Sequence, residues 1–295
     1  MSKINVIGAS CIDLLVSYVD IDKFFSGTYK VDNIKSSYGG DALNQSVVLN
    51  KLNDDVRLIT ILGDDTYGKD IINFLDNKNI QYNNNIIQKD IDTYISLVFI
   101  QNNGERLFVG NKNGSVRKLD LNHIEIDKDC EIVSFGSLFI SNELNDEKLT
   151  KLFKEIKDRN IILFVDCSNP KNNESVFNLN CLKYIDYLFM NLKEAKALTN
   201  LNNIDEIYDL FIENGVKNLI IKCGADGAYY NHKYYPAIKL DKVIDTTGAG
   251  DSFVSGFIHS ITNNSSIEEA IEFGNKLGNY ACRHIGSNGW VDIEL

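Results

Sequence analysis

Residues 245–253 read DTTGAGDSF, and they mark a point where a helix must begin. The run Gly248–Gly250 has minimal side chains and stands directly before an acid, Asp251. The residues KVI (242–244) just before the stretch are typical of the end of a strand. Apolar residues recur at helical spacing after it, so we expect a helix that starts within or just after the glycines. This apolar series consists of Phe253, Val254, Phe257, Ile258 and Ile261.

The start of this helix has the features of an anion site. Free N–H groups and the helix dipole favour an anion there, and small side chains let it approach the backbone. Asp251 falls in the first turn, where an acid can serve the dipole alone. A phosphoryl-transfer site explains the combination better, because the amides would stabilise the transferring group while Asp251 accepts the proton of the attacking hydroxyl. The pattern is neither GxxxxGKS/T nor GxGxxG, which disfavours Walker-type and Rossmann-type sites.

Outward from this helix, short apolar runs alternate with helical patterns along most of the chain. Near-continuous apolar runs are typical of strands buried on both faces, as in a parallel sheet covered by helices. Such runs occupy residues 4–9, 56–62, 130–136, 161–166, 187–190 and 219–224. Helical patterns occupy residues 41–52, 66–79 and 145–160. A capping box at Ser266 and Glu269 marks the start of a further helix, the last in the sequence. The alternation predicts a doubly wound α/β fold.

Two regions, residues 11–38 and 93–110, break this alternation. The first has aromatic residues and turn formers without a long helical pattern, and the second is typical of a hairpin around Asn102-Asn103-Gly104. Together they could form a small accessory sheet, used as a flap over an active site or as a dimerisation surface. Composition marks no linker, so we expect residues 1–295 to form a single compact domain with a small lid.

Composition and charge exclude several classes of function. The 295 residues carry a formal net charge of −11, which argues against broad binding to nucleic acid. No stretch has the length of apolar sequence that a membrane span requires, and the first residues do not form a signal peptide. Neither the four histidines nor the six cysteines cluster at metal-ligand spacing. We expect reduced thiols and a cytoplasmic protein that binds no membrane.

The sequence resembles the PfkB (ribokinase-like) family of sugar kinases over nearly its whole length. DTTGAGDSF is similar to the C-terminal signature of that family. Four further motifs follow the family order: VIGASCIDLLV (6–16), YGGDALNQSVVLNKL (38–52) with ILGDDTYG (61–68), NLKEA (191–195) and IKCGADGAYY (221–230). The resemblance implies a ribokinase-like, three-layer, mostly parallel sheet with a small β-sheet lid. It also implies ATP-dependent phosphorylation of a primary hydroxyl of a small sugar.

The resemblance assigns the catalytic roles to two of these motifs. Asp251 would be the general base, and the backbone of Gly248, Ala249 and Gly250 would form the anion hole for the γ-phosphate. Asn191 and Glu194 would organise Mg²⁺ and the phosphates, with Glu194 acting through water, which suits an ion that dehydrates reluctantly. The alternative for Glu194 is an acid that only serves the start of a helix.

The resemblance places the sugar against Asp13, Gly39, Gly40 and Asn44. Carboxylate and amide groups suit a polyol because their hydrogen bonds are directional. Without the family, Asn44 could be a solvated or capping residue and the two glycines a simple turn. Asp41 would either contact the sugar or cap the helix that begins near Ala42, and we weigh the two equally.

For ATP, the resemblance implies contacts from Lys222, Gly224 and Gly227, with Asn275 of the last helix near the base. Lys222 departs from the family, where threonine is common. It could reach a phosphate directly or be solvated, and we favour the solvated lysine. In FVDCSNPK (164–171), Lys171 replaces the arginine of a family motif, which weakens any inference of a phosphorylated substrate.

The family also often holds a monovalent cation beside the anion hole. Carbonyl oxygens near Asp245 and Thr247 would supply part of a K⁺ site, and homodimers often form through the lid. The nearest alternative function is a nucleoside kinase of the same fold, in which lid aromatics cradle a base; Tyr18, Phe24, Phe25 and Phe108 are the candidates. A non-catalytic sensor of sugar or nucleotide is the second alternative.

Overall fold

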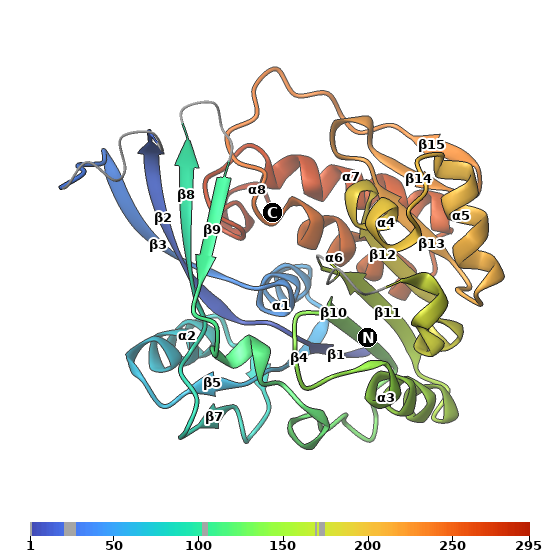
Figure 1. The fold of residues 1–295 in the computed structure, drawn as a ribbon, viewed down its shortest axis with the longest axis horizontal. Helices are drawn as coiled ribbons and strands as arrows, with labels where there is room; N and C mark the ends of the chain where they lie inside the picture. Colours follow the sequence, from blue (N-terminus) through green and yellow to red (C-terminus); the bar gives the residue numbers. More distant parts are fainter. Residues whose placement is uncertain (1, 21–27, 102–105, 169, 171–174) are drawn as a thin grey trace.

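The structure is a computed structural model that describes residues 2–20, 28–101, 106–168, 170 and 175–295. Its centre is a nine-stranded sheet (Figure 1). In spatial order the strands are β15 (Lys233–Tyr235), β14 (Ala228–Tyr230), β13 (Leu219–Lys222), β12 (Tyr187–Asn191), β11 (Ile162–Cys167), β10 (Ile132–Leu138), β1 (Lys3–Ile7), β4 (Asp55–Ile59) and β6 (Gln81–Tyr82). They pair in parallel, except that β14 is antiparallel to both of its neighbours, β13 and β15. The apolar runs of the sequence correctly predicted six of these strands.

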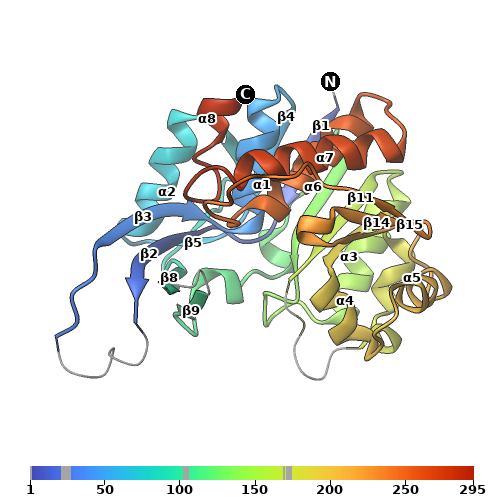
Figure 2. The ribbon, with the colours of Figure 1, turned by 90° about the horizontal axis from the view of Figure 1, so that it is seen from above.

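Helices cover both faces of this sheet, which gives three layers (Figure 2). Successive strand residues point to opposite faces, so Leu163 and Val165 join one hydrophobic core while Phe164 joins the other. The first core is closed by α3 (Asp146–Asp158), α4 (Leu192–Thr199) and α5 (Ile204–Glu213). The second is closed by α1 (Asp41–Lys51), α2 (Thr66–Asn77), α6 (Ala249–Thr262), α7 (Ile267–Ala281) and α8 (Val291–Glu294). The doubly wound prediction is confirmed.

A second, four-stranded sheet stands at one side of the large sheet (Figure 1). Its strands, in spatial order, are β3 (Asn33–Gly39), β2 (Cys11–Val19), β8 (Ile95–Gln101) and β9 (Arg106–Gly110). They come from the two regions that break the alternation in the sequence. β8 and β9 form the expected antiparallel hairpin, although its turn at Asn102, Asn103 and Gly104 lies outside the described residues. Two short strands, β5 (Leu62–Gly63) and β7 (Ile87–Gln88), pair separately.

The segment before α6 differs from the expectation. Residues 242–244 form no strand. The N–H of Ile244 instead donates to the carbonyl of Cys282 at 2.9 Å, at the end of α7. The β-branched residues there favour extended backbone, but no neighbouring strand is available to pair with them. The start of α6 itself, at Ala249, is where the glycine run predicted it.

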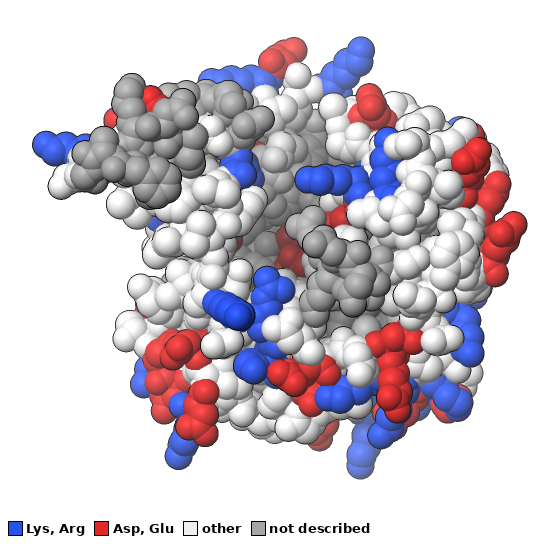
Figure 3. All heavy atoms as spheres, viewed as in Figure 1, with Lys and Arg blue, Asp and Glu red and all other residues white. Residues whose placement is uncertain are grey.

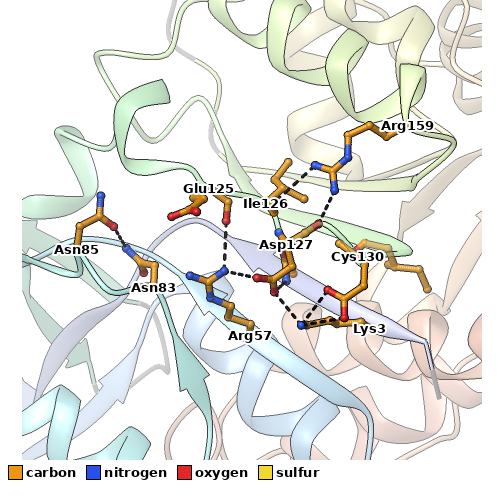
Figure 4. Close-up of polar contacts among 12 residues, drawn as sticks. Lys3, Arg57, Asn83, Asn85, Glu125, Ile126, Asp127, Cys130 and Arg159 are labelled. Carbon is orange, nitrogen blue, oxygen red and sulfur yellow. Dashed lines mark hydrogen bonds and ion pairs between the residues drawn. The ribbon is translucent and has the colours of Figure 1, made fainter.

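A polar cluster ties the strands together near their amino ends (Figure 4). Asp127 accepts a hydrogen bond from Arg57 at 2.5 Å and one from Asn5 at 2.9 Å, and Lys3 lies 3.5 Å away. Lys3 and Asn5 belong to β1 and Arg57 to β4, so these contacts fix the register of two central strands. This cluster does not occupy the opposite, carboxyl ends of the strands, which are therefore available for a functional site. Within the described chain, no helix combines the length and the apolar character needed to cross a membrane.

Candidate active site

The expected site residues gather where the parallel strands of the large sheet end. Asp166, Asn191 and Lys222 stand at or next to the carboxyl ends of β11, β12 and β13, which are neighbours in the sheet. Ligands in open α/β sheets bind at this edge. Figure 3 shows this face hollowed at its centre, between the side that carries the small sheet and the larger body.

The first turn of α6 supplies unpaired backbone donors. Gly248 adopts a left-handed conformation, with φ of 73°, and a side chain there would collide with the carbonyl of Ser287. Glycine is therefore required at this position. Within the described residues, the N–H groups of Gly248, Gly250 and Asp251 donate to no acceptor, and no side chain caps the helix. The N–H of Ala249, expected in the anion hole, donates instead to the carbonyl of Thr246 at 3.3 Å. Three free donors at a positive helix end are available to an anion.

Asp251 lies beside these donors and is held by an asparagine from α1. Asn44 Nδ2 donates to Asp251 Oδ2 at 2.7 Å, and Asn44 Oδ1 accepts from Asn288 Nδ2 at 3.1 Å. Asn44 is thus neither solvated nor a cap. Burial, together with the nearby charge of Asp41, raises the pKa of Asp251 well above its ordinary value. A carboxylate whose proton affinity is raised is better suited to accept a proton.

Asp41 does not cap the helix that it begins. No side chain caps α1, and Asp41 Oδ2 instead accepts a hydrogen bond from Ser137 Oγ at 2.8 Å, across to β10. The capping alternative is therefore wrong. Burial raises the pKa of Asp41, against the lowering effects of Ser137 and Lys222. The carboxylate is placed beside Asp251, and its contact with a sugar stays a prediction.

Asp13 and the glycine pair meet where β2 lies against β3. A side chain on Gly39 would collide with the Asp13 carboxylate. Gly40 has φ of 96°, and a Cβ there would lie 2.5 Å from the carbonyl oxygen of Ala9. Both glycines are therefore needed for close packing, in addition to any role toward a sugar. Burial raises the pKa of Asp13 to about 6, although Cys11 and Ser96 donate to it.

Asn191 and Glu194 form a capping box at the start of α4. Asn191 Oδ1 accepts from the Glu194 N–H, and Glu194 Oε2 accepts from the Asn191 N–H, both at 2.8 Å. Glu194 therefore serves the start of α4, and its role toward Mg²⁺ stays a prediction. Its side chain is nevertheless only 6% exposed, and in the described chain Oε1 accepts no hydrogen bond. Burial raises the pKa of Glu194. One carboxylate oxygen is left available for another partner.

Lys222 is not solvated, so that expectation is wrong. Its ammonium contacts both carboxylate oxygens of Asp166, at 2.7 and 2.9 Å, and the carboxylate is almost fully buried. The pair spans from β13 to β11. Burial raises the pKa of Asp166 to about 7, although the charge of Lys222 lowers it. Lysine was hard to place from sequence because its partner lies 56 residues away in the chain.

The residues expected near the nucleotide have structural roles of their own. Gly224 and Gly227 have positive φ values of 59° and 96°, which the turn between β13 and β14 requires. Asn275 donates to the backbone carbonyls of Tyr235 at 3.2 Å and Pro236 at 3.4 Å. It lines a groove of about 530 Å³ beside α7. Contact of these residues with ATP stays a prediction.

Arg106, at the start of β9, reaches the loop before α6. Its guanidinium pairs with Asp245 Oδ1 and Thr247 Oγ1, the side chains of the two residues whose neighbouring carbonyl oxygens are expected at a monovalent cation. Burial would raise the pKa of Asp245, but hydrogen bonds from Gly286 and Thr247 and the charge of Arg106 outweigh it, and the pKa lies below its ordinary value. The small sheet thereby contacts the anion loop directly.

Sequence reasoning missed four residues that shape the site. They are Arg106, Ser137, Asp166 and Asn288. Asp166 had a usable signal, since an acid directly after a buried strand lies at the functional edge of a parallel sheet. The structure does not describe Lys171, which replaces the arginine of a family motif. It also does not describe the side chains of Tyr18, Phe24 and Phe25, the candidates for contact with a base.

Comparison with known proteins identifies the class. The model of the pfkB family of carbohydrate kinases matches residues 1–292, and the chain belongs to this family. It is 26% identical to a ribokinase of Dictyostelium discoideum, over 97% of this chain and 96% of the relative. It is also 26% identical to a 2-dehydro-3-deoxygluconokinase of Escherichia coli K12, with the same two coverages.

Solved structures share the fold across the whole chain. The ribokinase of Thermotoga maritima superposes with a TM-score of 0.79 at 24% identity, covering 99% of this chain and 98% of that one. The ribokinase of Arabidopsis thaliana, solved with ribose and ATP, gives a TM-score of 0.79 at 21% identity, with coverages of 98% and 96%. The ribokinase-like fold, with a large mostly parallel sheet and a smaller sheet, is confirmed.

Proposed function

We propose that this protein transfers the γ-phosphoryl group of ATP to a primary hydroxyl of a small sugar. The observation that carries the proposal is the contact between Asn44 and Asp251, beside unpaired N–H groups at the start of α6. A proton acceptor and an anion site thus occupy one helical turn. Membership of the pfkB family supports the same activity.

The proposed reaction follows from this geometry. Asp251 accepts the proton of the sugar hydroxyl while the hydroxyl oxygen forms a bond to the γ-phosphorus. The bond from that phosphorus to the β-phosphate oxygen breaks, and ADP leaves with the electron pair. The free N–H groups of Gly250 and Asp251 stabilise negative charge on the transferring group. The protein therefore contributes positioning and charge rather than a covalent intermediate.

The sugar would lie between Asp251 and the small sheet. Asp13, Asp41 and Asn44 offer acceptors and an amide within a buried region, where directional hydrogen bonds discriminate between hydroxyl patterns. Because Gly39 and Gly40 have no side chains, the sugar could approach the backbone at this side of the proposed site. Because water competes as an acceptor, we propose that the small sheet acts as a lid that excludes it.

The residues present fit a magnesium ion. Glu194 keeps one carboxylate oxygen unused at a buried position, and hard oxygen donors are the ligands that Mg²⁺ prefers. Glu194, with Asn191 beside it, would hold the ion through water. When bound, Mg²⁺ neutralises charge on the ATP phosphates.

Arg106 places a positive charge beside the carbonyl oxygens expected to hold a monovalent cation. Its guanidinium pairs with the carboxylate of Asp245 and the hydroxyl of Thr247. A guanidinium repels a second cation nearby, so it disfavours a potassium ion at this loop. The proposed mechanism therefore includes no such cation.

We also propose a homodimer formed through the small sheet, in the cytoplasm. Four apolar side chains of this sheet are 45% to 64% exposed: Ile34, Leu107, Phe108 and Val109. Exposed apolar side chains at both edges of this sheet favour association. All six cysteines are free thiols, in keeping with a reducing compartment. Light scattering during size-exclusion chromatography would measure the oligomeric state, and a monomer at micromolar concentration would contradict the dimer.

The first experiment is a measurement of ADP release from Mg·ATP with a panel of acceptors. Pentoses, hexoses, 2-keto-3-deoxy acids, sugar phosphates and nucleosides belong in the panel. One sugar that accelerates ADP release strongly would confirm the proposal. Strong release with a nucleoside alone would favour the nucleoside kinase, with Phe108 as an aromatic contact. Binding of ATP without release for any acceptor would favour the sensor.

A further inference from the structure

The site contains more buried negative charge than a phosphate-binding site tolerates alone. Four carboxylates line it: Asp41, Asp166, Glu194 and Asp251. Burial raises the pKa of each, and each interacts electrostatically with one shared cation, Lys222. A triphosphate adds further negative charge to this region. The position of the Lys222 ammonium therefore bears directly on how this charge is balanced.

The ammonium of Lys222 is held against the anion hole. Its side chain leaves the end of β13 and reaches across β12 to Asp166 on β11, with contacts of 2.7 and 2.9 Å. A Cβ placed on Gly250 would lie 3.3 Å from Lys222 Nζ. The ammonium thus lies next to the backbone of Gly250, where the γ-phosphate is expected to bind.

The protonated state of Lys222 is secure. Burial lowers its pKa, but the charge and hydrogen bond of Asp166 and the charges of Glu194 and Asp251 outweigh this effect, and the net pKa is raised. An ammonium has three donors, and two contacts to Asp166 leave donor capacity for a third acceptor. A lysine in this state acts on phosphate as a point charge.

We propose that Lys222 is a catalytic residue that binds the transferring γ-phosphoryl group, and that Asp166 is the positioning residue that aims its ammonium. This inference rests on the proposed kinase activity. The lysine keeps its proton throughout: the hydroxyl proton goes to Asp251, and the electron pair of the broken P–O bond leaves with ADP. Lys222 compensates the charge on the γ-oxygens while the group is transferred.

The test compares a triphosphate with a diphosphate in binding, without turnover. Calorimetric titration of the full-length protein would use Mg·ADP and Mg·AMP-PNP, a non-hydrolysable ATP analogue. We expect Lys222→Met to weaken AMP-PNP by at least about tenfold, because a charged hydrogen bond to the γ-phosphate is lost. The affinity for ADP should change by less than about threefold. Lys222→Arg should restore part of the discrimination, since it keeps the charge.

The positioning role of Asp166 is tested by asking whether the effect of its substitution requires Lys222. If it acts by aiming the ammonium, Asp166→Asn reduces the preference for AMP-PNP over ADP. The double variant Lys222→Met/Asp166→Asn should then lose no more of that preference than Lys222→Met alone. The double variant also removes both buried charges, so it keeps the test available if the single lysine variant fails to fold.

A matched control is available elsewhere in the fold. Lys157 on α3 pairs with the buried carboxylate of Asp186, and neither residue belongs to the site. Lys157→Met should leave the ratio of the two affinities unchanged even if stability falls. An equal loss for ADP and AMP-PNP in the lysine variants, or no loss for either, would overturn the inference. Because no turnover is measured, this failure is distinct from a failure of the proposed function.

Discussion

Asn44 and Asp251 are 207 residues apart in the chain, and their side chains share a hydrogen bond of 2.7 Å. The contact joins the start of α1 to the start of α6. It links the residue expected to hold a sugar with the residue expected to remove its proton. Under the proposed function, this one contact positions both substrate and base, and the predictions below test what each partner contributes.

Asp251→Asn should lower kcat by a factor of about 10²–10⁴ while sugar and ATP still bind. The amide keeps the size of the side chain but cannot accept the hydroxyl proton. Single-turnover kinetics with calorimetric binding measures both quantities. Glu268→Gln is the control, because Glu268 is also an acid in the first turn of a helix, α7, but lies outside the site. Similar losses in the two variants would mean that Asp251 serves only the helix dipole.

Asn44→Ala should shift the acid limb of the kcat/KM profile to higher pH. The hydrogen bond from Asn44 stabilises the charged carboxylate and lowers the pKa of Asp251, against the dominant effect of burial. Without that bond the pKa rises further, so the proton-accepting form appears only at higher pH.

The control for this shift is Asn50→Ala, on the same helix. Asn50 Nδ2 donates to the backbone carbonyl of Lys78 at 3.0 Å, remote from the site. Its loss should cost about 1 kcal/mol of stability and leave the pH profile in place. An unshifted profile for Asn44→Ala, in protein that still turns over, would contradict the assigned role of the bond.

Turnover should not depend on potassium, because Arg106 already supplies positive charge to Asp245. Rates in KCl and in choline chloride should agree within about twofold. Arg106→Met should be slower in choline and recover partly in KCl, since the exposed carboxylate then becomes a cation ligand. Arg283→Met, which removes an arginine bound to Asn279 instead, should show no difference between the salts. Strong activation of the unmodified protein by KCl would contradict the prediction.

Gly248→Ala should destabilise the fold and slow turnover together. The left-handed backbone alone costs about 1–3 kcal/mol for an alanine, and the new Cβ also meets the carbonyl of Ser287. Gly224→Ala provides the comparison for stability, because its φ is also positive but no atom lies within 4 Å of the added Cβ. Thermal unfolding of both variants measures the difference. Equal losses would show that the Ser287 contact relaxes at no cost.

The sequence predicted the large sheet well because its strands are buried on both faces. Runs such as 161–166 are apolar at nearly every position, and the structure distributes Leu163 and Phe164 to opposite cores. Glycine and small residues likewise located the start of α6. Residues 242–244 were misassigned because β-branched composition reports a local preference, whereas strand formation needs a partner.

The polar contacts of the site were less predictable. Lys222 and Asp166 pair from separate strands of the large sheet, and Arg106 of the small sheet pairs with Asp245 in the loop before α6. Their partners are chosen by the tertiary arrangement, which no local pattern encodes. The motifs located the strand ends that carry the site. The predictions of a solvated Lys222 and a helix-capping Asp41 were wrong because the partners of these side chains come from other elements of the fold.

The loop after α7 closes the structure onto the first third of the chain. Ser287 Oγ and Asn288 Nδ2 donate to the carbonyl of Tyr38 at 2.9 and 3.2 Å, and Asn288 also holds Asn44. A ribosome makes Tyr38 and Asn44 well before Asn288. We therefore expect a nascent chain to gather most of its core before the hydrogen bond from Asn288 to Asn44 exists. A chain released before Ser287 is made would lack this support for Asn44, and we expect it to transfer phosphate poorly.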